Sequence, residues 1–368
     1  MTNQDCFDIA IVGGGLTGLM MAIALSHATS SSADTPAIVL IDRDDNTKKL
    51  RPDLRTTTIH AAGKIMLETL GVWDNLKAVP TPITSIKVGD SAPAKTDFAR
   101  RYQKGFRIDW HDPKTPMAYV VANEDLLAAL SRTLESRPVQ ILNGAEVVGI
   151  TRHNGAESSG LAKIQLADRS DISCHLIVAC DGANSQLREL AAMRRLVAPH
   201  RQTAIVANLR VERDHDNTAF QRFLPTGPMA LMPHGARHLS LVWTLPKTEA
   251  DKLHRCDDDT FSAAVYAGFG DYLGGIHLDG PRWLWPLIPS VMPELTSPQL
   301  ILAGDAGHVI HPLAGQGYNL ALGDAAVLAD AIAAAGARGL APSHLSVRTD
   351  YENGRKIEVR AMSAITSG

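Results

Sequence analysis

The sequence predicts an α/β fold in which a parallel sheet is interleaved with a mostly antiparallel sheet. The chain begins with an apolar run that leads through closely spaced glycines into a helical run. Two later apolar runs each end beside an acidic residue, and the middle of the chain alternates short strand-like runs with turns. The first two patterns are typical of open α/β sheets, and the third is typical of antiparallel sheets.

Composition excludes several classes of protein. The 368 residues are 45% apolar, which is enough for two domains or one large interleaved unit. The net charge is -3 and the basic residues are scattered, so no footprint for nucleic acid is present. The four cysteines form no CxxC pair, and the first residues show no signal-peptide pattern, so we expect reduced thiols and a cytoplasmic protein. Any membrane contact is expected to be peripheral, at the inner face, because no uninterrupted apolar segment reaches about 20 residues.

The glycines near the N-terminus predict a dinucleotide site. Phe7 to Val12 is an apolar run of strand length, and a helical run from Leu19 to His27 follows. Between them Gly13, Gly15 and Gly18 have the GxGxxG spacing. In that motif the first glycine makes the turn, the second admits the pyrophosphate and the third lets helix and strand pack closely.

Two polar residues after this unit, Asp42 and Arg55, are candidates for contact with a dinucleotide, and a third, Asn123, lies at a predicted helix start. Ala37 to Ile41 is a second apolar run, and it ends in Asp42, at the usual distance for binding the adenosine ribose. Arg55 precedes a predicted helix from Thr57 to Leu70 and is either a partner of the pyrophosphate or a solvated charge. Asn123 opens a predicted helix that runs to about Glu135, where it is a candidate helix cap. These residues do not distinguish NAD from FAD.

Two further strands end in acids. After Val139 to Ile150 and Ala162 to Leu166, both predicted strands, Leu176 to Ala179 leads into Asp181-Gly182. Leu300 to Ala303 leads into Gly304-Asp305. Carboxylates at the carboxyl end of a parallel sheet can accept hydrogen bonds from sugar hydroxyls, although a helix cap or turn is the alternative for each. Together with the glycine motif, they predict one long cofactor lying across a single sheet.

A second glycine-rich helix start follows. Gly315-Gln316-Gly317 precedes a run rich in alanine and leucine from Tyr318 to about Ala335, which predicts a helix. Glycines at a helix N-terminus let a ligand approach backbone N–H groups, whose partial positive charge favours an anion such as the edge of a reduced flavin.

The middle of the chain predicts a sheet that covers the cofactor. Four strand-like runs are followed by a helical stretch near Asp258 to Phe269; the runs are Ala204 to Val211, Ala219 to Leu224, Met229 to Met232 and Leu239 to Leu245. Met229 to Met232 is either plain core or the lining of a pocket.

Three motifs occur in order along the chain: Gly13/Gly15/Gly18, then Asp181-Gly182, then Gly304-Asp305 with Gly315-Gln316-Gly317. Together they resemble the motifs of the FAD-dependent aromatic hydroxylases, the p-hydroxybenzoate hydroxylase-like class of monooxygenases. The resemblance extends over nearly the whole chain. Within the class, two longer stretches are similar to the ubiquinone-biosynthesis hydroxylases: HPLAGQGYNLALGD from His311 and RFLPTGPMALMPHGARHLSLVWTLP from Arg222.

The resemblance implies domains and roles. It implies a Rossmann-like FAD-binding domain formed by 1–80, 117–190 and 297–340, interleaved with a mostly antiparallel substrate domain formed by 81–116 and 191–296, and a helical segment at 341–368. The residues implied to contact FAD are Gly13, Gly15, Gly18, Asp42, Arg55, Asn123, Asp181, Gly182, Gly304, Asp305, Gly315, Gln316, Gly317 and Asn319. His311 and Pro312 are the candidates for the catalytic wall beside the flavin, and His234 is a further candidate acid or base.

The implied activity is hydroxylation of an aromatic ring, with a polyprenylated phenol of ubiquinone biosynthesis as the expected substrate. NADPH or NADH would serve as a transient reductant, and O2 would react through a C4a-hydroperoxyflavin. Two alternatives remain open: another FAD-dependent oxidoreductase, such as a reductase or halogenase, and a flavin-bound member of a biosynthetic complex without turnover.

Three other patterns predict no chemistry. His308 and His311 have no third candidate ligand nearby, so no metal is expected. Trp283 to Pro289 is similar to the WxWxIP signature of flavin-dependent halogenases but has one residue too many, which favours aromatic packing. The alternating charges from Arg348 to Arg360 predict a solvated helix face.

Overall fold

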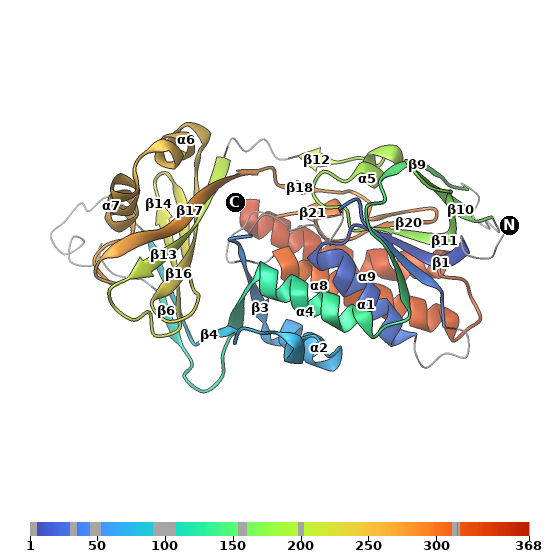
Figure 1. Ribbon diagram of the computed structural model, residues 1–368, viewed down its shortest axis with the longest axis horizontal. Helices are drawn as coiled ribbons and strands as arrows, with labels where there is room; N and C mark the ends of the chain where they lie inside the picture. Colours follow the sequence, from blue (N-terminus) through green and yellow to red (C-terminus); the bar gives the residue numbers. More distant parts are fainter. Residues whose placement is uncertain are drawn as a thin grey trace.

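A computed structural model describes residues 6–29, 35–44, 53–90, 108–153, 160–197, 202–310, 315 and 317–367. Two large sheets lie at opposite ends of the molecule, with a layer of helices against the first (Figure 1). The predicted combination of a parallel sheet with a mostly antiparallel sheet is confirmed.

The first sheet has eight strands among the described residues and carries the N-terminal glycine motif. Its main path has the order β19-β20-β11-β1-β2-β8, and β10 and β9 extend it from β11. The pairs β20–β11, β11–β1, β1–β2 and β2–β8 are parallel. The strands are β1 (Cys6–Val12), β2 (Ile38–Ile41), β8 (Val139–Leu142), β9 (Val147–Thr151), β10 (Ala162–Leu166), β11 (Ile172–Ala179), β19 (Thr296–Ser297) and β20 (Leu300–Leu302).

The central strands are buried on both faces, as their continuous apolar sequences require. Helix α1 (Leu16–Ala28) is apolar around most of its circumference, and every residue from Gly18 to Ser26 is buried between the sheet, α4 (Asn123–Glu135) and α8 (Gly317–Gly336). Figure 1 shows these helices lying together with α9 (Leu345–Ser367) in the centre of the molecule.

The second sheet has seven strands in the order β17-β13-β16-β15-β14-β5-β6, antiparallel except for the β14–β5 pair. Its strands are β5 (Ser85–Asp90), β6 (Ile108–His111), β13 (Gln202–Val211), β14 (Thr218–Leu224), β15 (Gly227–Pro233), β16 (His238–Pro246) and β17 (Ile276–Leu287). Helices α6 (Lys247–Arg255) and α7 (Asp258–Phe269) cover one face (Figure 1). Along the chain, β5 and β6 of the second sheet come after β1 and β2 of the first sheet but before its strand β8. The two sheets are therefore interleaved in sequence.

Two small three-stranded sheets connect the halves. One is formed by β3 (Thr56–His60), β7 (Ala118–Ala122) and β4 (Thr81–Ile83), and the other by β12 (Leu196–Val197), β18 (Ser290–Val291) and β21 (His308–Val309). Other short helices in the described part of the chain are α2 (Ala61–Thr69), η1 (Trp73–Asn75) and α5 (Gln186–Leu190).

Two predicted boundaries are wrong. The helix expected from Thr57 to Leu70 begins only at Ala61, because the β-branched residues Thr56 to Ile59 pair with β7 as strand β3. The strand expected from Val139 to Ile150 is interrupted at Gly144, whose φ of 64° turns the chain between β8 and β9.

Helix α8 is the one helix in the described part of the chain that is long and apolar enough to cross a membrane by length and composition. However, 56% of its most apolar 18-residue stretch is buried inside the protein, where the helix contacts α1 and α9. Burial of this kind accounts for its composition as a core helix.

Helix α9 has the solvated charged face that its sequence predicts, with Asp350, Glu358 and Arg360 exposed, but its opposite face is buried. Tyr351 and Arg355 are almost completely buried. The Arg355 guanidinium lies over Gly323 of α8, donates from Nε to Asp324 Oδ1 at 2.7 Å and from Nη2 to the Leu320 carbonyl at 2.9 Å. Burial acts to lower the pKa of Arg355, but Asp324 outweighs it and the pKa is raised. The ion pair therefore joins α9 to α8.

We expect Arg355→Ala to lower the free energy of unfolding by about 3–5 kcal/mol, because it leaves the buried Asp324 carboxylate without its guanidinium partner. Urea unfolding followed by circular dichroism would measure the change. Arg360→Ala is the matched control, since Arg360 lies on the same helix but is exposed, and it should leave the stability nearly unchanged. Equal effects of the two variants would contradict a structural role for the buried pair.

Candidate functional site

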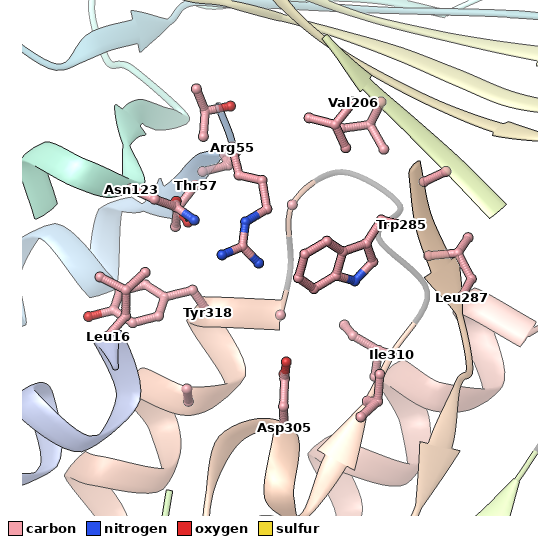
Figure 2. A pocket seen from close by; sticks show the side chains of 18 of the residues that line it. Leu16, Arg55, Thr57, Asn123, Val206, Trp285, Leu287, Asp305, Ile310 and Tyr318 are labelled. Atoms are coloured by element: carbon pink, nitrogen blue, oxygen red, sulfur yellow. The ribbon is translucent and has the colours of Figure 1, made fainter. Parts of the chain in front are cut away.

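A cavity of about 480 Å³ lies between the two large sheets (Figure 2). One side is formed by the start of α1, strand β3, Asn123, Asp305 and the start of α8, and it carries most of the polar groups. The other side is formed by strands β13, β15, β16 and β17 and is mostly apolar. The two sides therefore offer different chemistry to a ligand.

The glycine motif has the geometry that its spacing predicts. Gly13 has a φ of 109°, and a Cβ there would lie 2.4 Å from the Cys180 carbonyl oxygen, so only glycine fits the turn. A Cβ on Gly18 would lie 1.8 Å from the Gly13 carbonyl oxygen. In contrast, a Cβ on Gly15 would meet no protein atom within 4 Å, and Gly15 lines the cavity at the N-terminus of α1. This open backbone at a helix start suits an anionic group.

Asp42 lies at the carboxyl end of β2, beside the glycine turn. A Cβ on Gly14 would lie 2.2 Å from its Oδ2, so the turn and the carboxylate are in contact. Burial raises the pKa of Asp42. The carboxylate is outside the cavity, in the position from which it could accept hydrogen bonds from a ribose next to the turn.

Arg55 is held in place by a network of side chains rather than being a free solvated charge. Asp53 accepts hydrogen bonds from Arg55 Nε at 2.8 Å and from Arg55 Nη2 at 2.7 Å. Burial acts to raise the pKa of Asp53, but the contact with Arg55 outweighs it and the pKa is lowered. Asn123 donates to Asp53 and accepts from Thr57, and it does not cap α4, whose N-cap is Ala122. The network presents the guanidinium to the cavity (Figure 2).

Asp305 projects into the cavity from the short helix η2 (Gly304–Ala306) (Figure 2). The side chain of Asp305 is open to the cavity, but the surrounding protein limits the hydration of its carboxylate and raises its pKa, an effect that His308 and Arg55 oppose. Gly304, the residue before it, has a φ of 58° and does not itself line the cavity. Its N–H donates to Asp324 Oδ2 at 2.7 Å.

The same oxygen of Asp324 lies 2.7 Å from His308 Nε2. Burial acts to lower the pKa of His308, but the Asp324 carboxylate outweighs it and the pKa is raised. Burial acts to raise the pKa of Asp324, and the contacts with His308 and Arg355 outweigh that effect, so its pKa is lowered. Both directions favour a charged pair, which fixes η2 and therefore Asp305. His308 is occupied by this contact, and no group of three potential metal ligands occurs among the described residues.

Asp181 and Gly182 follow β11 at the same edge of the sheet. Gly182 has a φ of 82° and lines the cavity. Asp181 Oδ2 accepts from the Leu187 N–H at 3.1 Å, while Oδ1 is buried without a partner. An unpaired buried carboxylate oxygen is a place where a ligand can donate a hydrogen bond.

Residues at the start of α8 have different roles. Gly315 and Gly317 line the cavity. Asn319, predicted to meet the flavin, donates to the Thr58 carbonyl at 2.7 Å and accepts from the His60 N–H at 3.1 Å. Its carboxamide therefore joins α8 to β3. His311, Pro312 and Gln316 lie outside the described residues, and His234 follows β15 without lining the cavity.

The apolar side follows from the alternation of the strands. On β15, Met229 and Leu231 belong to the core under α7, whereas Ala230 and Met232 line the cavity. Both interpretations of Met229 to Met232 therefore hold, each for alternate residues.

From the sequence, one contributor to the site was assigned to aromatic packing and two others were overlooked. Trp285 lies at the centre of the cavity, with the Arg55 guanidinium carbon 4.5 Å from its ring centroid (Figure 2). It is more than aromatic packing, since 47% of its surface is exposed. Thr56 to Thr58 also line the cavity. Their run of β-branched residues was the sequence signal that could have predicted a strand here. Ser240 on β16 is the third.

The site fits FAD. The open backbone at Gly15, the carboxylate at Asp42, the unpaired oxygen of Asp181 and the exposed face of Asp305 follow one edge of the parallel sheet, as an extended dinucleotide requires. The start of α8 and the apolar sheet border the space beyond them.

Comparisons with known proteins agree with this assignment. A family model described as an FAD binding domain matches residues 6–362. The chain is 34% identical over 363 residues to the ubiquinone hydroxylase UbiL of Rhodospirillum rubrum, covering 98% of this chain and 80% of that protein. It is 30% identical over 366 residues to the 3-demethoxyubiquinol 3-hydroxylase of Escherichia coli, covering 96% and 86% respectively.

Solved structures show the same fold at low sequence identity. The FAD-dependent monooxygenase PqsL from Pseudomonas aeruginosa has a TM-score of 0.76 at 18% identity, covering 98% of this chain and 95% of that chain. The p-nitrophenol 4-monooxygenase PnpA from Pseudomonas putida has a TM-score of 0.75 at 16% identity, covering 99% and 88%.

The glycine motif gives a paired prediction. We expect Gly15→Ala to change the stability of the apoprotein by no more than about 1 kcal/mol, because its Cβ enters open space at a helix cap. The same change should weaken FAD binding, measured by quenching of flavin fluorescence. Gly18→Ala should instead destabilise the apoprotein itself, because its Cβ overlaps the Gly13 carbonyl. Unchanged FAD affinity in Gly15→Ala would contradict the placement of the pyrophosphate.

Proposed function

The chain belongs to the FAD-binding-domain family of flavoprotein monooxygenases, and on that premise we propose that it hydroxylates the aromatic ring of a polyprenylated phenol in ubiquinone biosynthesis. The names of two relatives, a ubiquinone hydroxylase and a 3-demethoxyubiquinol 3-hydroxylase, support this substrate class. The same names favour hydroxylation over the alternatives of reduction, halogenation or a role without turnover.

The single observation that carries the proposal is the two-sided cavity. Its polar side holds the residues suited to FAD, and its apolar side holds a surface suited to a ring with a hydrocarbon tail. Met232, Val206 and Val242 provide flexible and aliphatic contacts on that surface. A nonpolar substrate would gain free energy by leaving water at this surface, at about 25 cal/mol per Å² of apolar area buried.

FAD, when bound, supplies the redox chemistry by which one atom of O2 reaches the ring. The residues of the chain position the reactants and exclude water. Asp305 offers a hydrogen-bond acceptor to the cofactor and Arg55 offers a positive charge. The apolar strands on the other side of the cavity exclude water from the space next to the cofactor. The electron-rich ring needs orientation more than activation, because a phenol oxygen already donates electron density to it.

We further infer that NADPH or NADH reduces the flavin transiently. The sequence contains one GxGxxG unit, which the FAD fit occupies, so a nicotinamide would have to bind without a second fingerprint of this kind. A prenylated phenol partitions into lipid, which supports a cytoplasmic enzyme in peripheral contact with the inner face of the membrane, alone or within a biosynthetic complex.

Oxygen incorporation tests the reaction class. We expect the FAD-loaded protein, supplied with reductant, a short-tailed prenylphenol and 18O2, to form a product that carries one 18O atom, detected by mass spectrometry. Reactions in H2 18O with ordinary O2 should give no label in the product. Consumption of the reductant with no oxygenated product would contradict hydroxylation and favour a reductase or oxidase.

The reductant is tested separately by anaerobic stopped-flow absorbance. We expect NADPH or NADH to bleach the oxidised flavin band, and the short-tailed prenylphenol to accelerate the bleaching. Dithionite serves as the control that the bound flavin is reducible. A flavin that dithionite reduces but neither nicotinamide does would exclude direct nicotinamide reduction and indicate a protein electron donor.

A further inference from the structure

The hydroxyl group of Ser240 is a buried polar group that nothing in the fold explains. Ser240 is 1% exposed, and its Oγ has no hydrogen-bond partner within the described part of the chain. A buried hydroxyl left unpaired costs about 1–3 kcal/mol relative to one that is paired or solvated. Such a group is seldom retained for stability, so its surroundings indicate its use.

The side chain of Ser240 belongs to the cavity face of β16. Along this strand Leu239, Leu241 and Trp243 belong to the core under α7, whereas Ser240 and Val242 line the cavity. Strand alternation therefore places the Ser240 side chain on the cavity face of the sheet, and rotation about its Cα–Cβ bond can turn the hydroxyl toward a ligand there. A change of register that hid it would also expose the core residues.

The neighbours of Ser240 on the sheet leave it isolated. Its partners across the two adjacent strands are Met232 on β15 and Asn208 on β13. Met232 offers only a weak acceptor. The Asn208 Oδ1 is likewise buried without a partner, although Asn208 does not line the cavity.

The apolar side of the cavity thus contains little that can bind an oxygen. Among the described lining residues of β13, β15, β16 and β17, the polar side-chain groups are the Ser240 hydroxyl and the indole N–H of Trp285. Trp285 is stacked on Arg55 toward the polar side (Figure 2), whereas Ser240 lies on a strand otherwise lined by aliphatic side chains. One hydroxyl in such a surface can set the orientation of a ring.

We propose that Ser240 is the residue that recognises the ring oxygen of the substrate and so sets which ring carbon faces the flavin. The assignment rests on the proposed function and deepens it, because it names an oxygen-bearing ring, a phenol, as the group bound at this point. A hydroxyl can donate to a phenolate oxygen and accept from a phenol, so it serves either protonation state. No bond is made or broken by Ser240, which acts as a positioning residue.

The test compares a short-tailed prenylphenol with the prenylbenzene that lacks only the ring hydroxyl. Dissociation constants for both would be measured by isothermal titration calorimetry on the oxidised, FAD-loaded protein, without turnover. The preference is the dissociation constant of the prenylbenzene divided by that of the prenylphenol. We expect a clear preference in the wild type, reduced by about two- to tenfold in Ser240→Ala, the range that one hydrogen bond gives.

Two variants serve as controls. Ser240→Thr keeps the hydroxyl and should retain the preference, even if its added methyl group weakens the binding of both ligands. Thr244→Val removes a hydroxyl from the same strand and the same buried face but outside the cavity, and it should leave the preference unchanged. Ser240→Ala removes no existing hydrogen bond, so its melting temperature should equal or exceed that of the wild type.

The outcomes separate this assignment from the function on which it rests. An unchanged preference in Ser240→Ala, with tight binding of the prenylphenol by both proteins, would overturn the role of Ser240 and leave the substrate class intact. A wild type that binds neither ligand would overturn the phenol substrate and the role of Ser240 together. A wild type that binds both ligands equally would show that no ring oxygen is recognised, and would overturn the assignment while leaving an apolar substrate.

Discussion

The buried carboxylate of Asp324 is the contact on which the site depends. It joins α8 to two other segments: the turn after β20, through the N–H of Gly304 and through His308 at the start of β21, and helix α9, through Arg355. A carboxylate without exposure to solvent is stable only when its oxygens are paired, and each oxygen has a charged partner here. Gly304 and His308 lie on either side of Asp305 in the sequence. The carboxylate of Asp324 that binds Arg355 of α9 therefore also fixes the position of Asp305, which faces the cavity.

The cavity obtains its two kinds of chemistry from two kinds of sheet. Carboxyl ends of parallel strands meet at one edge, which gathers Asp42, Asp181 and Asp305 although each follows a different strand. The antiparallel sheet has one face packed on α7 and leaves the other facing the cavity. A polar cofactor and an apolar ring can therefore meet at a boundary that neither sheet could form alone. Trp285 and Arg55 lie in contact across this boundary.

The interleaving of the chain has a structural consequence for this boundary. Strand β17 of the antiparallel sheet ends at Leu287, and β18 at Ser290 already pairs with β21, next to His308. On the other side, β4 and β7 connect the antiparallel sheet to β3, whose residues Thr57 and Thr58 bond to Asn123 and Asn319. The antiparallel sheet and the parallel sheet are thus connected by the chain on both sides of the cavity.

The sequence by itself determined the fold class, the order of the main elements and the glycine turn at Gly13 to Gly18, because these depend on local patterns: apolar runs, glycine spacing and acids at strand ends. It did not determine the strand at Thr56 to Ile59, since a short run of β-branched residues becomes a strand only when a partner such as β7 is present. Nor did it reveal the burial of Arg355, because a charged residue on a helix is expected in water until a partner such as Asp324, 31 positions away, is brought to it. Ser240 was likewise an ordinary residue of a predicted strand, and Trp285 was assigned to aromatic packing. Tertiary structure alone decided that both face the cavity, because the side of the sheet to which a residue points depends on what packs against the opposite face.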